Sequence, residues 1–403
     1  MKWIKTIGPG LAVAATGVGA GDMVAAAVAG SKYTVAVVWA VVLGAILKYT
    51  LNEGIGRWQF ATGTTLLEGW IAKLPKWVSW YFLIYLFLWT FIVGGALMSS
   101  CGIAAHSIFP GISVSQWAII HSFGGMALVY WGKYSFFEKA IKFFIGLMFG
   151  TLIISAAMIL PDIDFLPLTT TASYIPKGSG KFLVGILGGV GGSVTLLSYS
   201  YWLRESKSSS KSNFRNSKWE LLISYGFTGL FGIAVLLIAS SVNLPGEYSG
   251  SQLILAIADT LESKTGTPGR FIFLFGFWGA VASSLLGVWQ GVPYLFSDFI
   301  HSSGFTKTLK VNNLQNKYYN GYLLYLGLAP VLLLYFDKPL WVVIIYSIIG
   351  AFFMPFLAII LLILNNKKEW VGDFKNPVLI NILLILSILI FGYLCVVEVL
   401  ETV

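Results

Sequence analysis

The sequence predicts an all-α membrane protein with about eleven transmembrane helices and no separate soluble domain. Two observations lead to this fold class. First, hydrophobic residues make up 57% of the 403 residues and charged residues only 11%, whereas soluble domains carry about 25% charged residues. Second, the chain contains a series of apolar runs of about 20 residues, the length that a helix needs to cross a bilayer.

The apolar runs place these helices in order along the chain. The stretch 161–181 is rich in Pro, Asp, Thr and Ser, and 204–218 is polar and basic, so both are expected to be loops. The basic loop serves either as a cytoplasmic anchor, which is the simpler interpretation, or as a contact for anionic lipid. The helices are expected near residues 8–31, 34–56, 78–105, 115–131, 136–160, 182–203, 219–242, 270–298, 319–336, 339–364 and 377–398.

The distribution of Lys and Arg predicts how the bundle is oriented. With a cytoplasmic N-terminus, 19 of the 26 Lys and Arg residues fall in inner segments, six in outer segments, and Lys48 within a helix. Positive segments stay in the cytoplasm during insertion, so this asymmetry supports the orientation and puts the C-terminus outside. It also accounts for the net charge of +9, so no nucleic-acid partner is expected. The predicted location is the lipid bilayer of the bacterial inner membrane, as a multi-pass protein.

Two glycine-rich segments mark helices that are expected to be discontinuous. The first helix contains GVGAGD at residues 17–22, and the sixth contains GGVGG at residues 188–192. Transporters built from inverted repeats often unwind such helices, which exposes backbone groups to a substrate near the bilayer midplane. Close packing of helices through small residues is the alternative explanation. The pattern predicts one transmembrane domain over residues 1–403, with inverted repeats at about 8–160 and 182–364 and an extra helix at 377–398.

Several charged residues fall inside the predicted helices. Asp22 lies in the first glycine-rich segment, and a carboxylate at that depth is a candidate functional residue. Glu53 and Arg57 lie one turn apart and are expected to form an intrahelical ion pair rather than a substrate site. Lys48 either extends to the interface or pairs with an acid.

Neither the cysteines nor the histidines form a recognisable metal or catalytic pattern. Cys101 and Cys395 lie inside apolar runs without CxxC spacing, so buried free thiols are expected. His106, His121 and His301 show no ligand spacing. The sequence also lacks a catalytic triad, a phosphate loop and paired acids at mid-membrane depth, so neither enzyme activity nor a cofactor is expected.

Three segments of the chain carry a family resemblance. They are GPGLAVAATGVGAGD at residues 8–22, RWQFATGTTLLEGW at residues 57–70, and the paired serines of the eighth helix. Together they resemble the Nramp superfamily of divalent metal transporters, over most of the chain and in register with the helix count. The resemblance implies eleven or twelve helices in the inverted-repeat fold named for the bacterial leucine transporter.

The metal-binding signatures of that family are replaced in this chain. Where the family has DPGN in helix 1, this chain reads GAGD, with Gly19 at the Asp position and Asp22 at the Asn position. Where the family has MPHN in helix 6, it reads TLLS, with Thr195, Leu197 and Ser198 at the Met, His and Asn positions. Transition metals prefer imidazole, thioether or carboxylate ligands, and this set offers one carboxylate and hydroxyl groups.

Positions near the two glycine-rich helices gain aromatic and neutral polar side chains. The resemblance places Phe353 where the family has a Gln on helix 10, and Trp289 and Gln290 lie on helix 8. Such groups suit a sugar, whose C–H faces stack on rings and whose hydroxyls need donors and acceptors, although the rings could instead serve packing. The predicted substrate site comprises Asp22, Gly19, Thr195, Ser198, Tyr199, Trp289, Gln290 and Phe353, with Tyr201, Trp202 and Tyr294 nearby.

The leading hypothesis is therefore a monomeric secondary transporter for a small polar solute. The expected substrate is a monosaccharide such as glucose, which would cross the membrane by alternating access, in facilitated or weakly proton-coupled transport. The chain would then resemble an atypical, sugar-transporting branch of the superfamily that lacks the metal signature. The alternative is a transporter of Mg²⁺ or Mn²⁺ that uses Asp22 and backbone carbonyls. A non-transporting receptor is disfavoured because no sizeable soluble domain is predicted.

Overall fold

The computed structural model describes residues 8–18, 20–132, 134–163, 165, 176, 178–189, 193–206, 213–241, 250–303, 316–336 and 339–402. These residues form helices joined by turns and contain no β-strand, which confirms the predicted all-α class. Gly19, the side chains of Asp22 and Cys395, and most of the predicted loop 161–181 lie outside the described residues.

Eleven transmembrane segments can be traced through the described residues when each discontinuous helix counts as one crossing. The first five are α1 (Pro9–Gly17) with α2 (Ala20–Tyr33), α3 (Val38–Thr62), α5 (Lys76–Ile108), α6 (Val114–Trp131) and α7 (Tyr134–Ile159). The next five are α9 (Gly180–Gly189) with α10 (Ser198–Glu205), α11 (Phe214–Ser240), α13 (Thr267–Ser302), α14 (Lys317–Leu328) with its 3-10 extension η6 (Ala329–Phe336), and α15 (Pro339–Asn365). The eleventh is α17 (Val378–Thr402).

Length and composition alone identify some of these crossings. Within the described part of the chain, five helical stretches have mean hydropathies between 1.9 and 2.2 and suffice to cross a membrane. They are Ala25–Thr62, Lys76–Ile108, Phe136–Ile159, Phe214–Ser240 and Thr267–Ser302.

Both predicted interruptions are present. α1 ends at Gly17, and Val18 adopts φ −82° and ψ 86°, outside the helical region, before α2 begins at Ala20. α9 ends at Gly189, and the helix resumes in the 3-10 turn η4 (Val194–Leu197), which leads into α10. Interrupted helices leave backbone groups without partners in their own helix, and those groups become available to a ligand.

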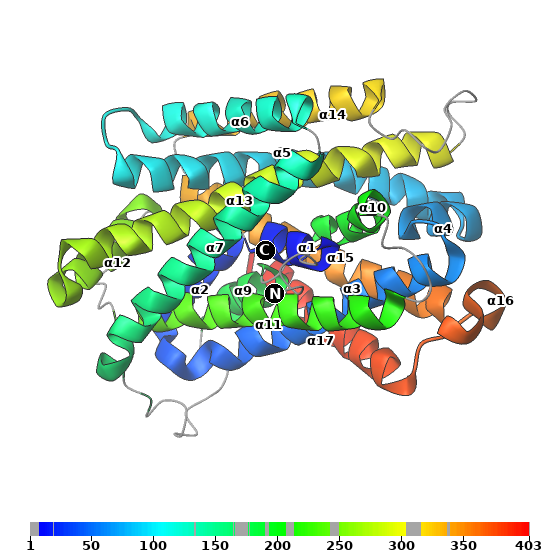
Figure 1. The fold of residues 1–403 in the computed structure, drawn as a ribbon. Coiled ribbons are helices and arrows are strands. Elements are labelled where there is room, and N and C mark those ends of the chain that lie inside the picture. Colours follow the sequence, from blue (N-terminus) through cyan, green and yellow to red (C-terminus); the bar gives the residue numbers. More distant parts are fainter. Residues whose placement is uncertain are drawn as a thin grey trace.

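Three short helices lie at the two ends of the bundle and were not predicted from the apolar pattern. α4 (Leu66–Lys73) and α16 (Lys368–Val371) lie at one end, and α12 (Gly250–Thr265) at the other (Figure 1). A capping box between Thr65 and Glu68 begins α4. α12 is amphipathic, so its polar face hides it from a search for apolar runs. It buries Leu253, Ile254, Ile257, Ala258 and Leu261.

The loop predicted at 204–218 is shorter than expected, because α10 continues to Glu205 and α11 already begins at Phe214. The Arg204 guanidinium pairs with Glu68, and the Tyr294 hydroxyl donates to Glu205 at 3.0 Å. These tertiary contacts keep the last turn of α10 helical although its composition is polar.

The predicted ion pair within α3 is confirmed, and it also holds the linker before α17. Arg57 Nε donates to Glu53 Oε2 at 3.2 Å, and both side chains are buried. Arg57 Nη1 donates to the carbonyls of Phe374 and Lys375 at 3.1 and 3.3 Å. The guanidinium also lies 5.2 Å from the centre of the Phe214 ring, so one side chain joins α3, α11 and the linker.

Candidate functional site

The interruption of helix 6 lies against α5 and α15. Trp89 Nε1, on α5, donates to Ser193 Oγ at 3.0 Å. A Cβ on Gly350 of α15 would lie 3.3 Å from Ser193, so the glycine allows the two backbones to approach closely. Tyr85, one turn before Trp89, stacks on Phe353 with ring centres 5.7 Å apart. Three aromatic rings therefore flank the interruption on this side.

Two carboxamides on α3 bind helix 6 from the opposite side. Asn52 Nδ2 donates to the Leu196 carbonyl at 3.2 Å, and Gln59 Nε2 donates to the Ser200 carbonyl at 2.9 Å. Both amides are fully buried, and neither side-chain oxygen has a hydrogen-bond partner among the residues that the structure describes. A buried polar atom without a partner is costly, so these oxygens are available to a ligand.

α13 provides the third side of the site. Ser198, the first residue of α10, lies against Gly291, where a Cβ would be only 2.6 Å from Ser198 Oγ. Trp202 Nε1 donates to Gln290 Oε1 at 2.5 Å. Within the described residues, the hydroxyls of Thr195 and Ser198 and the Gln290 Nε2 are buried without a partner. This face thus adds two hydroxyl groups and an amide donor.

The structure brings together some of the predicted site residues and separates others. Ser198 and Gln290 lie where α10 meets α13, and Thr195 lies one turn before Ser198 in η4. Phe353 lies on α15, one turn after the Gly350 that packs against Ser193. These four are at most 3% exposed, so the site is closed to solvent.

Tyr199 and Trp289 point away from this group. The Tyr199 ring packs on Gly56 of α3, and its hydroxyl forms a hydrogen bond with Ser217 of α11. The Trp289 indole lies against Gly125 of α6. Gly19 and the Asp22 side chain lie outside the described residues, so their predicted roles stay predictions.

Sequence reasoning missed Asn52, Trp89 and Ser193. A carboxamide within an apolar run was the signal that could have indicated Asn52. Trp89 carried no such signal, because aromatic residues are frequent throughout the apolar helices.

α1 is held at both ends of its short length. Glu220 Oε1, on α11, accepts hydrogen bonds from the backbone N–H groups of Gly8 and Gly10 at 3.1 and 2.7 Å. A carboxylate at this position complements the positive end of the helix dipole. Near the interruption, the Thr16 carbonyl accepts a hydrogen bond from Ser284 Oγ at 2.7 Å, which ties α1 to α13.

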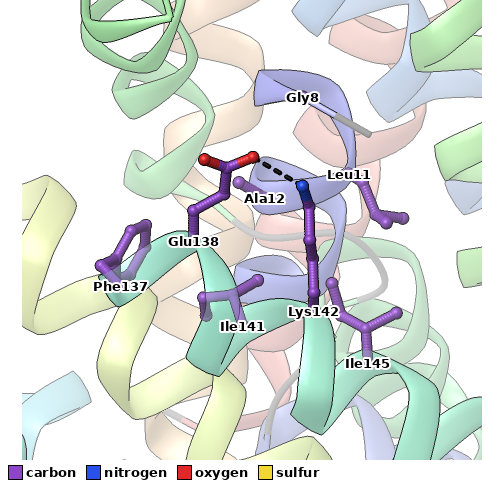
Figure 2. A pocket seen from close by; sticks show the side chains of 8 residues that line it. All are labelled: Gly8, Leu11, Ala12, Phe137, Glu138, Ile141, Lys142 and Ile145. Atoms are coloured by element: carbon purple, nitrogen blue, oxygen red, sulfur yellow. Dashed lines mark hydrogen bonds and ion pairs between the residues drawn. The ribbon is translucent and has the colours of Figure 1, made fainter. Parts of the chain in front are cut away.

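A pocket lies beside α1, on the side that faces α7. It is lined by Gly8, Leu11 and Ala12 from α1 and by Phe137, Glu138, Ile141, Lys142 and Ile145 from α7 (Figure 2). Glu138 and Lys142 form an ion pair at 2.6 Å. Their charges neutralise each other, so the pocket is not a strongly charged binding site.

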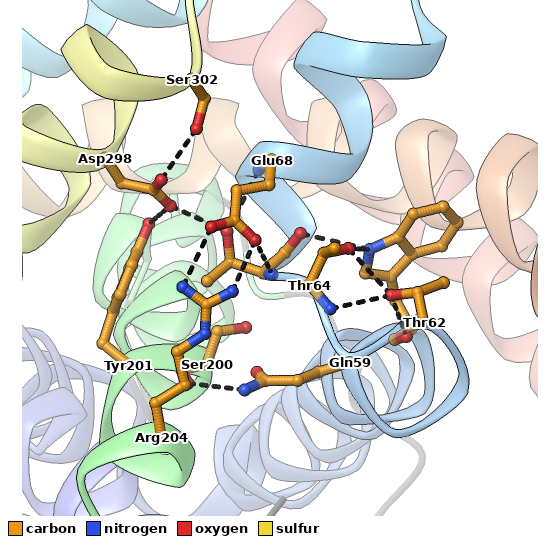
Figure 3. Close-up of polar contacts among 11 residues, drawn as sticks. Gln59, Thr62, Thr64, Glu68, Ser200, Tyr201, Arg204, Asp298 and Ser302 are labelled. Atoms are coloured by element: carbon orange, nitrogen blue, oxygen red, sulfur yellow. Dashed lines mark hydrogen bonds and ion pairs between the residues drawn. The ribbon is translucent and has the colours of Figure 1, made fainter. Parts of the chain in front are cut away.

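A network of polar contacts, which we call the α10 network, fastens α10 to α4 and α13 (Figure 3). Arg204 donates to both oxygens of Glu68, at 3.0 and 2.5 Å. The buried Asp298 Oδ2 accepts hydrogen bonds from Tyr201 at 2.6 Å and from Thr65 at 2.8 Å. These five residues come from α4 and its cap, α10 and α13, so they close the α4 end of the bundle.

The buried groups without a hydrogen-bond partner that the structure places at the interruption are neutral donors and acceptors with aromatic neighbours. Such groups can form hydrogen bonds with a polar solute and pack on its apolar faces. Among the described residues, no three His, Cys, Asp or Glu side chains gather into a possible metal site.

Comparisons with known proteins agree with this architecture. The family model for natural resistance-associated macrophage protein-like proteins (Nramp) matches residues 10–401. A search of curated proteins finds no match. Among solved structures, a mutant of the Eremococcus coleocola manganese transporter superposes with a TM-score of 0.75 at 15% identity, covering 97% of this chain and 85% of that chain.

Two further structures share the fold at lower similarity. A Na⁺-coupled sialic acid symporter in a substrate-bound outward-open state gives a TM-score of 0.60 at 13% identity, covering 95% of this chain and 88% of that chain. A nucleobase-cation-symport-1 family transporter in a closed conformation gives 0.54 at 11% identity, covering 95% and 90%. The chain thus belongs to the Nramp family and is a secondary transporter of the leucine-transporter-like fold rather than an enzyme.

Proposed function

We propose that the protein carries a monosaccharide such as glucose across the membrane. The observation that supports this substrate is the set of buried neutral groups at the interruption of helix 6. Asn52 Oδ1 and the hydroxyls of Thr195 and Ser198 lack hydrogen-bond partners within the described residues. Buried polar groups are rarely left unpaired in proteins, and a sugar offers hydroxyls that both donate to the amide oxygen and accept from the serine and threonine.

The aromatic rings beside these groups fit the same substrate. Trp89, Tyr85 and Phe353 flank Ser193 at the interruption. The C–H faces of a pyranose are apolar and pack on such rings, while its rim of hydroxyls meets polar groups. Asp22, which the sequence places in the first interrupted helix, would add a carboxylate that accepts hydrogen bonds from the sugar.

Alternating access would move α1 and α10 relative to the helices around them. The α10 network and the Glu220 cap on α1 hold both helices at the α4 end in the described structure. Opening toward that end therefore has to break these contacts. We propose that this end faces the cytoplasm of a bacterial cell, with the C-terminus outside, and that a monomer suffices for facilitated or weakly proton-coupled transport.

Transport of a divalent metal is the second candidate. The observation in its favour is the structural similarity to a manganese transporter over 97% of the chain. At 15% identity this similarity concerns the fold. The unpartnered groups that the structure describes at the interruption are neutral oxygen and nitrogen atoms, which bind Mn²⁺ weakly unless carboxylate or imidazole ligands accompany them.

Uptake into proteoliposomes tests the proposal directly. The purified protein should take up labelled glucose with saturation and should take up no Mn²⁺ above protein-free vesicles. Thr195→Val removes the unpartnered hydroxyl with little change of shape and should lower glucose uptake about tenfold. Thr228→Val is the matched control, because its buried hydroxyl is bound to the Ser224 carbonyl of its own helix. Mn²⁺ uptake without glucose uptake would refute the sugar proposal.

A further inference from the structure

The carboxylate of Glu220, on α11, binds the first turn of α1 through backbone groups. Pro9, the first residue of α1, has no N–H, and the glycines on either side of it present theirs without a side chain in the way. Glu220 Oε1 accepts both, from Gly8 at 3.1 Å and from Gly10 at 2.7 Å. A Cβ on Gly10 would lie only 3.1 Å from Glu220 Cγ, so the glycine lets the carboxyl group lie directly against the helix end.

This carboxylate lies in a transmembrane helix, where an ionisable side chain is expensive and usually has a function. None of the ion pairs among the described residues includes Glu220. Lys218, two residues earlier on α11, lies over the Phe214 ring instead, 5.2 Å from its centre. A carboxylate without a nearby cation is held in its charged form less firmly than one in an ion pair, so Glu220 can gain and lose a proton during a transport cycle.

The other titratable groups near Glu220 are neutral or already paired. α1 itself, from Pro9 to Gly17, carries no titratable side chain. α2 packs on the far half of α11, where a Cβ on Gly30 would lie 2.4 Å from the Leu236 carbonyl, so its charges are distant. The titratable groups on the remaining neighbours are Tyr199 on α10, Tyr49 and the pair of Glu53 and Arg57 on α3, and the pair of Glu138 and Lys142 on α7.

We propose that Glu220 is a proton-binding site and that its protonation releases α1 from α11. The carboxylate is stabilised by the positive end of the α1 dipole, and its hydrogen bonds are stronger than those of a neutral acceptor. When Glu220 takes a proton from solution, Oε1 becomes a weaker acceptor and the charge at the helix end disappears. α1 is therefore held when the pH is high and released as the pH falls.

The contact at the other end of α1 does not titrate. There Ser284 Oγ donates to the Thr16 carbonyl at 2.7 Å. A proton on Glu220 thus loosens the first turn of α1 and leaves the end near the interruption in place. Because opening at the α4 end moves α1, uptake and release of this proton are linked to substrate transport. That link rests on the proposed function, whereas the release of α1 does not.

Hydrogen exchange of the α1 amides, measured by mass spectrometry on the purified full chain, tests the release without any substrate. After correction for the intrinsic exchange rate, the wild type should exchange at least about tenfold faster at about pH 5.5 than at about pH 8.5, because charge-assisted hydrogen bonds are lost. Glu220→Gln, which is uncharged throughout, should show the fast rate at both values.

Two further variants separate titration from simple loosening. Ser284→Ala removes a contact of α1 that carries no proton, so any acceleration should be additional to the pH effect and equal at both pH values. Glu369→Gln, exposed on α16, should match the wild type. Equal corrected exchange of α1 in the wild type at the two pH values would overturn the proposal, and so would a pH effect that persists in Glu220→Gln.

Glucose uptake into proteoliposomes separates this inference from the proposed function. A proton gradient directed into the vesicles should speed uptake by the wild type and have no effect on uptake by Glu220→Gln. If the wild type takes up no glucose but α1 exchange follows pH through Glu220, the sugar proposal fails and the proton site stands. If glucose is taken up and neither uptake nor α1 exchange responds to pH through Glu220, the sugar proposal stands and the proton site fails.

Discussion

Removing the pair between Glu68 and Arg204 should open the protein toward the α4 end. The pair contributes two charge-assisted hydrogen bonds, at 3.0 and 2.5 Å, and its side chains are 17% and 25% exposed. A buried hydrogen bond to a charged group contributes about 1.5–3 kcal/mol, and exposed ion pairs contribute much less. For this partly exposed pair we expect about 2 kcal/mol, which shifts the equilibrium between closed and open states about 30-fold.

The double variant Glu68→Gln/Arg204→Gln avoids leaving one charge alone, and Gln at position 68 can still complete the capping box of α4. A Thr195→Cys reporter, in a background with Cys101→Ala and Cys395→Ala, measures access to the site. Its rate of alkylation by a reagent added at the α4 end should rise by about 10- to 30-fold when the pair is removed.

The pair of Arg270 with Glu262 at the α12 end provides the control, since its bond of 2.8 Å lies at the opposite end of the bundle. Removing that pair should leave the alkylation rate from the α4 end unchanged. An unchanged or slower rate in the Glu68→Gln/Arg204→Gln variant would show that the α10 network does not hold the closed state.

Three further changes test the packing and the site. Arg57→Ala should destabilise the protein by about 3–5 kcal/mol, because it leaves the buried Glu53 without its partner; thermal unfolding in detergent measures this, and Arg57→Ala/Glu53→Gln should recover part of the loss. Gly287→Ala should lower the free energy of unfolding by about 1–3 kcal/mol through overpacking, because a Cβ there would lie 1.9 Å from Thr16 Oγ1 of α1. Gly146→Ala is the control: nothing lies within 4 Å of a Cβ at that position, so the change should be neutral or slightly stabilising. Gln290→Leu should lower glucose affinity about tenfold or more in binding assays, and an unchanged affinity would remove this amide from the site.

Most of the helical framework could be predicted from local properties of the chain. Apolar runs of about 20 residues indicate crossings because every backbone group in a bilayer needs an internal partner. Glycine clusters indicated both interruptions for a similarly local reason. Two helices were not predicted. α12 is amphipathic, and α4 is a short helix that depends on a cap formed by Thr65 and Glu68.

The site was predictable only in part, since each residue along a helix turns the side chain by about 100°. Thr195, Ser198 and Gln290 were assigned to one site, and the structure places Ser198 against Gly291, next to Gln290, with Thr195 one turn earlier in η4. Tyr199 is next to Ser198 in sequence and nevertheless packs on α3 and α11. No pattern in a single sequence distinguishes these two neighbours.

Hydropathy and glycine content act locally, so the sequence by itself determined the series of membrane-crossing helices and the two interrupted ones. The resemblance of three segments indicated the Nramp family, which the family model confirms over residues 10–401. The tertiary structure decided which side chains surround the interruption of helix 6. It brought Asn52 of α3 and Trp89 of α5 to that place. These residues are about 100 to 150 positions away from helix 6 in the chain, and only the packing of helices against one another sets the rotation that turns them inward.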